Sequence, residues 1–386
     1  MKTILVSLIS EQTIPNILIG AHYKPDIFWF ISTPKMEDKR MTECIENTLR
    51  LKGLLTQPDP IKKVIVDQDS LTDCISKIES LVEDITGEVQ YIINITGGNK
   101  VMALAAYEIF REIGQKVVID YMPIGKNEFV QVFPRRKPLK VSMIRERLNL
   151  EEYLSSYGFK IQNKDKLQTI KSSAIACKDA SNWILNNYEH LKGLLGFIYK
   201  NLKDGRGKKR YHFQSTFDRN PARIERDLLN RHGFELQDGL ISKDMTKEEM
   251  VYLTGGWFEE YVFNEVFDLV LDNILDDAMT GLTIENLGGV SNELDIAFVR
   301  DNIFYHIECK TLGEGDKDIV REEVYKKGAI STLLGKGEKR AFICTTLNKI
   351  SEAIITRGQD YGIEILSLDK VRDLRNRLKE RFGRRE

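Results

Sequence analysis

The first 135 or so residues alternate short apolar runs with stretches of helical periodicity. The apolar runs are 3–9, 26–32, 63–66, 89–96 and 116–122. Between them, Met36–Leu51 and Ser70–Ile85 carry apolar side chains at helical spacing. Continuous apolar strands separated by helices predict βαβ units and a parallel sheet that is covered on both faces. We therefore expect a Rossmann-like α/β domain, whose ligands lie at the carboxyl ends of its strands.

Two loops at those strand ends carry small polar residues. Ser10 and Gln12 follow the first strand, and the fourth is followed by Thr96, Gly97, Gly98, Asn99 and Lys100. A helix that begins near Lys100 would point its unpaired amides at the space above the turn, and those amides attract anions. A bound anion would also offset the unfavourable position of a lysine in the first helical turn. A plain tight turn with an exposed lysine explains the same residues. Neither loop has a GxGxxG or Walker A pattern.

From about residue 140 to 250 the pattern weakens. We expect helices over 145–157 and 172–202. The basic, glycine-broken loop Asp204–Arg210 then precedes the aromatic Tyr211–Phe213. Such a loop contacts a nucleic-acid backbone in some proteins and is merely solvated in most. The expected organisation is a domain at 1–138, a mixed, mostly helical linker at 139–245 and a second α/β domain at 246–386.

The stretch "NELDIAFVRDNIFYHIECKT", residues 292–311, predicts a β-hairpin. If Asp301 and Asn302 form a two-residue turn, Asp295 lies opposite Glu308, and Glu293 lies opposite Lys310. These four charged side chains then share one face of the hairpin. A three-residue loop would scatter them over both faces.

Carboxylates that are crowded on one sheet face repel one another, and a divalent cation relieves that repulsion. Oxygen ligands of this kind suit Mg²⁺ or Mn²⁺. A lysine beside such a metal can position a water for attack on a phosphodiester. The alternative is a solvated strand face with cross-strand ion pairs.

A helix is predicted over 254–271, upstream of the hairpin. Its periodicity places Glu259 inside a broad apolar arc, whereas Glu260 and Asn264 fall on the polar side. A carboxylate on a buried stripe needs a partner. A metal or a lysine in the adjoining sheet would supply one, although a glutamate at a helix start can also extend to solvent.

Composition limits the remaining options. The chain has 386 residues, 42% of them hydrophobic and 30% charged, which suits a soluble protein of two or three domains. Its 57 basic and 58 acidic residues give no overall attraction to nucleic acid. The five cysteines are scattered and form no CxxC pair, so neither a disulfide framework nor a zinc site is indicated. We expect a cytoplasmic protein with no membrane segment.

The order of these acidic residues resembles a known superfamily. Glu259 on a helix, Asp295 in a hairpin and Glu308-Cys309-Lys310 on the next strand are similar to the PD-(D/E)xK nucleases, with Leu294-Asp295 in place of Pro-Asp. That resemblance places a helix at 318–334 and a strand at 340–345. The front domain, with its Thr96–Lys100 loop, resembles the CRISPR-associated Rossmann-fold (CARF) sensors.

Together the two parts resemble the type III CRISPR accessory nucleases. The resemblance implies a homodimer whose CARF domains bind cyclic oligoadenylate, with cyclic tetra-adenylate as the first candidate, through Thr96–Lys100, Ser10 and Gln12. It also implies a Mn²⁺- or Mg²⁺-dependent endonuclease with Asp295, Glu308 and Glu259 as metal ligands and Lys310 beside them. The substrate would be DNA, RNA or both, including single strands or plasmid DNA.

Two other functions fit the sequence. One is a ligand-responsive nucleic-acid-binding regulator that reads DNA through the basic middle segment and carries an inactive nuclease domain. The other is a ring nuclease that degrades cyclic oligoadenylate in its own sensor pocket. The set Asp295, Glu308 and Lys310 favours an endonuclease over the regulator, and the sensor loops contain no histidine to favour the ring nuclease.

Overall fold

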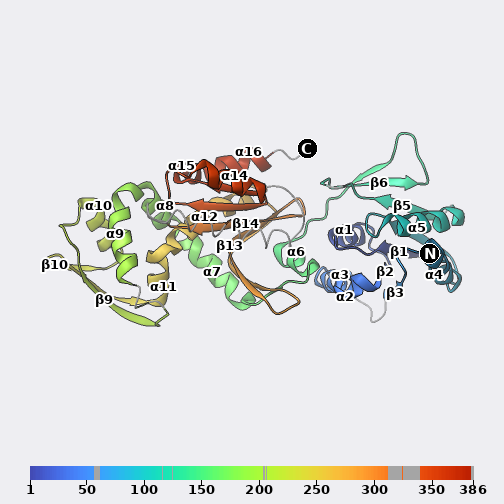
Figure 1. Ribbon diagram of the computed structural model, residues 1–386, viewed down its shortest axis with the longest axis horizontal. Coiled ribbons are helices and arrows are strands. Elements are labelled where there is room, and N and C mark those ends of the chain that lie inside the picture. The colour runs from blue at the N-terminus through green and yellow to red at the C-terminus, as the bar shows by residue number, and fades with distance from the viewer. Residues whose placement is uncertain are drawn as a thin grey trace.

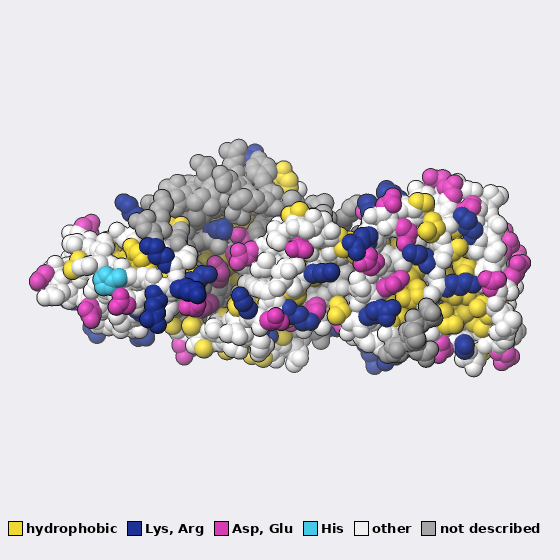
Figure 2. All heavy atoms as spheres, turned by 90° about the horizontal axis from the view of Figure 1, so that it is seen from below, with side chains coloured by type: hydrophobic (Ala, Val, Ile, Leu, Met, Phe, Trp, Pro, Cys, Tyr) yellow, Lys and Arg dark blue, Asp and Glu magenta, His cyan; other side chains and the backbone are white. Residues whose placement is uncertain are grey.

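The computed structural model describes residues 1–55, 61–114, 116–123, 125–202, 205, 207–311, 324 and 340–383. The molecule is elongated, with the N-terminal sheet at one end, a second sheet in the middle and a smaller lobe of helices and short strands at the other end (Figure 1). Acidic and basic side chains are interspersed over the face that Figure 2 shows, as expected from the balanced composition.

The N-terminal sheet has seven strands in the order β3-β2-β1-β4-β5-β6-β7. They are β1 Lys2–Leu8, β2 Ile27–Ser32, β3 Ile61–Ile65, β4 Val89–Asn94, β5 Val117–Tyr121, β6 Glu128–Phe133 and β7 Val141–Met143. The first five are parallel, which confirms the predicted βαβ domain. The antiparallel β6 and β7 extend one edge and were not predicted.

Helices cover both faces of this sheet. They are α1 Ile14–Tyr23, α2 Pro34–Asp38, α3 Met41–Leu51, α4 Leu71–Glu83 and α5 Lys100–Ile113. Leu5 of β1 packs in the core that includes α1 and α3, whereas Ile4 and Val6 pack in the core that includes α4 and α5. The predicted single helix over 36–51 was wrong, because the chain breaks at Arg40, which has a left-handed φ of 56°.

The middle segment is more varied than the predicted linker. Its elements are α6 Leu150–Ser156, β8 Lys160–Ile161, α7 Lys164–Ala176, α8 Lys178–Asn186, α9 Tyr188–Asn201, β9 Arg210–Thr216, α10 Arg223–Arg231, β10 Glu235–Gln237, β11 Leu240–Thr246 and α11 Lys247–Val251. The expected helix over 172–202 is interrupted at Cys177 and Asn187. β10, β11 and β9 form a separate three-stranded sheet.

The second sheet has the order β16-β15-β14-β13-β12-β8. Its later strands are β12 Asp277–Glu285, β13 Ser291–Arg300, β14 Ile303–Lys310, β15 Ala341–Thr345 and β16 Ile363–Leu366. β8 joins this sheet from the middle segment, so the sheet draws on residues before 246. β15 confirms the strand expected at 340–345, whereas the helix expected at 318–334 lies outside the described residues apart from Val324.

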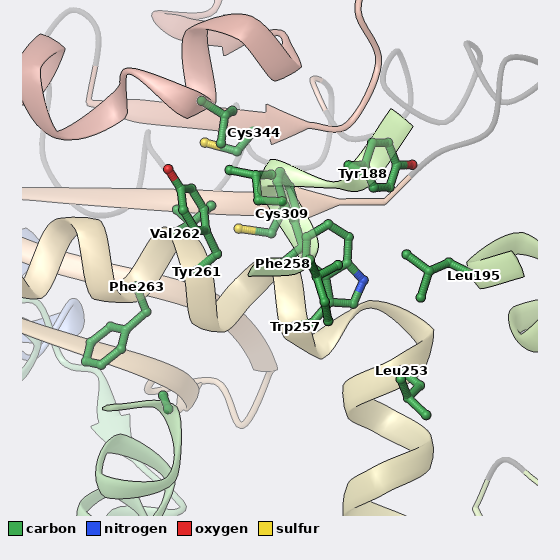
Figure 3. Close-up of a cluster of buried hydrophobic side chains, with 14 of the residues drawn as sticks. Tyr188, Leu195, Leu253, Trp257, Phe258, Tyr261, Val262, Phe263, Cys309 and Cys344 are labelled. Atoms are coloured by element: carbon green, nitrogen blue, oxygen red, sulfur yellow. The ribbon is translucent and has the colours of Figure 1, made fainter. Parts of the chain in front are cut away.

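The main helix of this domain is α12, Trp257–Leu271, which follows a π-helical turn, η1 Tyr252–Gly256. The remaining helices are α14 Glu352–Asp360, α15 Leu368–Arg372 and α16 Leu374–Phe382. Trp257, Phe258 and Val262 of α12 pack with Cys309 of β14 and Cys344 of β15 in the largest apolar core (Figure 3). This core holds the start of α12 against the end of the hairpin.

The turn of the β13–β14 hairpin connects the two sheets. Asn302 accepts a hydrogen bond from the Leu148 amide at 2.9 Å and donates to Asn127 Oδ1 and to the Glu146 carbonyl, each at 3.1 Å. Its side chain is buried, with 6% exposed. A buried amide that makes three such bonds fixes the position of the hairpin relative to the N-terminal domain.

We predict that Asn302→Gly weakens this connection. Glycine keeps the left-handed backbone, since Asn302 has a φ of 62°, but it removes all three hydrogen bonds. Leaving buried partners unpaired is expected to lower the free energy of unfolding by about 1–3 kcal/mol, seen as a lower thermal midpoint. Asn273→Gly is the matched control, because Asn273 also has a left-handed φ of 57° but is exposed. Equal midpoints for the two variants would contradict the role of Asn302.

Candidate active site and ligand cavity

The hairpin register places two acids opposite each other. Arg300 pairs with Ile303 and Ile296 pairs with Ile307, which confirms the two-residue turn. Asp301 and Asn302 have φ values of 50° and 62°, the two left-handed residues of a type I′ turn. Continuing the register past Ile296 brings Asp295 opposite Glu308, as the sequence predicts.

The regular ladder opens at this point. A continued ladder would pair Cys309 with Leu294, but the Cys309 amide donates instead to Asp295 Oδ2 at 2.7 Å. On the neighbouring strand, Gly281 has a left-handed φ of 64°. Ala278 before it packs in the α12 core, whereas Leu282 after it packs in the core shared with the N-terminal domain. The local change of face at Gly281 accompanies the departure of Asp295 from the ladder.

Lys310 and Glu259 complete the group. The Lys310 ammonium lies 2.7 Å from Glu308 Oε1, and the Glu308 side chain is 7% exposed. Burial raises the pKa of the Asp295 carboxyl, and the nearby charges of Glu308 and Glu259 raise it further. Burial likewise raises the pKa of Glu259, with Glu308 adding to the effect and Lys310 opposing it. The structure therefore brings all four predicted residues close enough to influence one another's charge.

The other acid at the start of α12, Glu260, makes its hydrogen bonds away from the hairpin. Burial raises the pKa of Glu260 to about 7, and its carboxylate is hydrogen-bonded by Cys177 and Ser181. Asn264 is also buried and donates to the Ala174 carbonyl at 2.8 Å. The predicted polar side of this helix was wrong, because α7 and α8 pack against α12 as well.

The chemistry of the acids fits a hard divalent cation. Within the described ranges, no group of three or more His, Cys, Asp or Glu side chains is arranged to hold a metal ion by itself. Mg²⁺ is commonly bound through only one or two carboxylates, with waters and substrate phosphates as further ligands. Asp295 and Glu308 raise each other's cost of ionisation, which a cation between them would remove.

At the other site, the two glycines of the loop after β4 have separate structural roles. A Cβ on Gly97 would collide with the backbone carbonyl of Leu8, so the close approach of β1 requires glycine there. Gly98 has a left-handed φ of 67°. Asn99 caps α5 by accepting a hydrogen bond from the Met102 amide at 2.9 Å.

A cavity of about 850 Å³ opens at the carboxyl ends of the N-terminal strands. The predicted ligand residues that line it are Ser10, Gln12, Thr96, Gly98 and Asn99. Gly97 and Lys100 are not among the described lining residues, and Lys100 is exposed at the first position of α5. Sequence reasoning missed the part of the wall that comes from outside the strand loops, namely Tyr153, Tyr157, Asp301, Asn302, Ile303 and Arg340.

Comparison with known families identifies both ends of the chain. Residues 4–153 match the family described as "Card1 CARF domain", and residues 246–384 match "Card1-like, endonuclease domain". The chain joins a Card1-type CARF domain to a Card1-like endonuclease domain. No curated protein matches the sequence significantly.

Solved structures share this CARF–endonuclease fold over nearly the whole chain. Protein VC1899 from Vibrio cholerae has a TM-score of 0.79 at 20% identity and covers 99% of this chain and 98% of its own. Can2 from Sulfobacillus thermosulfidooxidans, solved with cyclic tetra-adenylate, has a TM-score of 0.78 at 19% identity. The match covers 99% of this chain and 100% of the Can2 chain. A type III CRISPR defence DNA nuclease activated by cyclic oligoadenylate has a TM-score of 0.54 at 16% identity. The match covers 90% of this chain and 45% of that nuclease.

The two candidate sites thus fall in the two matched domains. Asp295, Glu308, Lys310 and Glu259 belong to the endonuclease domain, and the loop after β4 belongs to the CARF domain. Among the described helices, none combines the length and apolar character needed to span a bilayer.

Proposed function

We propose that this protein is a metal-dependent endonuclease, activated by cyclic oligoadenylate, that cleaves DNA or RNA in CRISPR antiviral defence. The observation that carries the proposal is the group of Asp295, Glu308 and Lys310 at the open end of the hairpin, within an endonuclease domain. Burying two neighbouring carboxylates costs free energy, and a protein that only bound nucleic acid would gain nothing in return.

Each residue has a proposed part in phosphodiester hydrolysis. Asp295 and Glu308 would hold Mn²⁺ or Mg²⁺, with Glu259 as a third or outer acid. When bound, such an ion would supply Lewis-acid stabilisation of the charge that develops on the phosphate. Lys310, fixed by Glu308, orients the attacking water or neutralises a phosphate oxygen. Asp295 keeps its orientation because its Oδ2 atom accepts the Cys309 amide.

The CARF cavity is the proposed activator site. Ser10, Gln12, Thr96, Gly98 and Asn99 line it, and Gly97 shapes the turn. Lys100 lies at the start of α5, where an anion would be favourable. The related Can2 was solved with cyclic tetra-adenylate, which supports the same ligand class here. A homodimer suits a ring ligand, because a two-fold axis can match the rotational symmetry of the ring.

The test is cleavage of plasmid DNA, single-stranded DNA and RNA by the full chain with Mn²⁺, with and without cyclic tetra-adenylate. We expect cleavage that requires both. Binding of nucleic acid without cleavage would favour the regulator, and loss of the ring without cleavage of other substrates would favour the ring nuclease.

Variants of the acids should separate catalysis from ligand binding. We predict that Glu308→Ala, Lys310→Ala and Asp295→Asn reduce cleavage by at least 100-fold, on the scale of removing a preorganised charged group. Binding of cyclic tetra-adenylate by calorimetry should stay unchanged, because none of these three residues lines the proposed ligand cavity. Glu260→Gln is the control, since Glu260 contacts α8 instead of the hairpin. Wild-type cleavage by Glu308→Ala or Lys310→Ala would overturn the nuclease site.

Metal binding should depend on the same acids. Chelation by EDTA is expected to abolish cleavage, and added Mn²⁺ or Mg²⁺ should restore it. Calorimetric titration with Mn²⁺ should show an affinity about tenfold weaker or more for Asp295→Asn, because a neutral amide replaces a charged oxygen ligand. Unchanged affinity in a folded Asp295→Asn protein would exclude Asp295 as a ligand.

Lys100 provides a further test on the sensor side. A charge-assisted contact to a phosphate contributes roughly 1.5–3 kcal/mol. Lys100→Ala should therefore raise the cyclic tetra-adenylate concentration needed for half-maximal cleavage about tenfold or more, without lowering the thermal midpoint, because alanine favours a helix. An unshifted dose–response curve would remove Lys100 from the ligand site.

A further inference from the structure

The endonuclease domain supplies one wall of the CARF cavity. On one side lie the CARF loops, including Ser10, Thr96 and Asn99. On the other side lie the hairpin turn, Asp301–Ile303, and Arg340, all of which come from the second sheet. A ligand that fills this space would therefore contact both domains at once.

Arg340 is the residue of this wall best suited to an anion. It is half-buried, directly before β15, and its carbonyl accepts the His306 amide at 3.1 Å, which ties it to β14. Within the described part of the chain, its guanidinium has no carboxylate partner at ion-pair distance. By contrast, Asp301, the other charged side chain of this wall, pairs with Arg147 at 3.0 Å.

The surroundings of Arg340 also suit a nucleotide. Its charge opposes the rise in pKa that burial gives Tyr157, so the guanidinium lies near that hydroxyl. The Tyr157 hydroxyl lies 3.4 Å from Oε1 of Gln12, a residue of the CARF wall. Tyr157 stands beside Tyr153, with 5.4 Å between ring centroids. Tyr153 is buried and holds Tyr157 in place, whereas Tyr157 is partly exposed. A guanidinium next to the Tyr157 ring offers both a bidentate phosphate contact and a surface on which a base can stack.

We propose that Arg340 binds a phosphate of the activating oligonucleotide, so that the ligand joins the CARF domain to the endonuclease sheet. This inference rests on the proposed activation by cyclic oligoadenylate and adds a residue of the endonuclease domain to that binding site.

The position of Arg340 connects the ligand with the acids through the strands themselves. Ile303 at the cavity and Glu308 near the metal site lie five residues apart on β14, about 17 Å at an extended rise. β15 begins one residue after Arg340 and runs parallel to β14, with Ile343 paired to Glu308. A ligand held by Arg340 would therefore restrain the start of β15 and of its partner β14, and β14 carries Glu308 and Lys310 at its far end.

The experiment measures binding of cyclic tetra-adenylate to the full chain by calorimetry, beside a dose–response of cleavage. Arg340→Ala is expected to weaken binding about tenfold or more and to shift the activation curve by a similar factor. Arg340→Lys should have an affinity between those of wild type and Arg340→Ala, because lysine keeps the positive charge but lacks the planar, two-pronged guanidinium. Arg50→Ala is the matched control, since Arg50 is exposed on α3 and does not line the cavity; it should leave both curves unchanged.

Binding by Arg340→Ala within twofold of wild type would overturn the inference while leaving the proposed function intact. If Arg340→Ala has a lower thermal midpoint than wild type, ligand binding is measured with Arg340→Gln instead, because glutamine keeps much of the side-chain stem but not the charge. Binding by Arg340→Gln within twofold of wild type would likewise overturn the inference. A wild-type protein that neither binds the ring nor responds to it would instead overturn the proposed function, and the inference with it.

Discussion

The two-residue turn at Asp301 and Asn302 is the constraint on which both candidate sites depend. Both residues adopt left-handed backbone angles, which few residue types tolerate and which asparagine and aspartate tolerate best among side-chain-bearing residues. Since side chains alternate along a strand, a shift of one residue would send Asp295 and Glu308 to opposite faces. The same turn is held by Asn127 and Leu148 at the N-terminal domain. One local conformation therefore sets the geometry of the acids and the contact between domains.

The acids of the endonuclease domain are held together against their mutual repulsion. The Cys309 amide anchors Asp295, and the Cys309 side chain is buried in the apolar core beneath α12 (Figure 3). Glu308 is tied to Lys310, which offsets only part of the negative charge. Buried carboxylates this close together keep their negative charge only beside further positive charge, and otherwise they take up protons, which is why the pKa values of Asp295 and Glu259 are raised. A divalent cation bound as proposed would offset this charge, and with only a few protein ligands it would leave coordination positions for substrate and water.

Much of this could be predicted because the relevant signals are local. The turn residues fix the register of the hairpin, and the apolar runs of the first domain predict parallel strands. Interruptions such as the one at Arg40 were missed, since the helical periodicity of apolar residues continues across the break. The burial of Glu260 was missed for a related reason, because the segment that covers it, 164–186, lies about 80 residues earlier in the chain.

The residues that line the ligand cavity also differ in how well the sequence predicts them, because some come from consecutive segments and others from distant ones. Thr96 and Asn99 could be predicted from a strand, a turn and a helix that are consecutive in sequence. Arg340 stands more than 200 residues away, and it reaches the cavity because β15 pairs with β14, whose turn lies against the CARF domain. A basic residue directly before a buried strand was the only sequence signal, and it does not distinguish this position from Lys116 before β5.

This arrangement also bears on how ligand binding can regulate a distant site. A ligand shifts a conformational equilibrium only to the extent that its affinity differs between the two states. A ligand held by the CARF loops alone would make no contact that depends directly on the position of the endonuclease sheet. Contacts that come from Arg340 and the hairpin turn change as soon as the sheet moves. If cyclic oligoadenylate fills the cavity as proposed, the two-domain wall gives the ligand contacts that differ between positions of the endonuclease sheet.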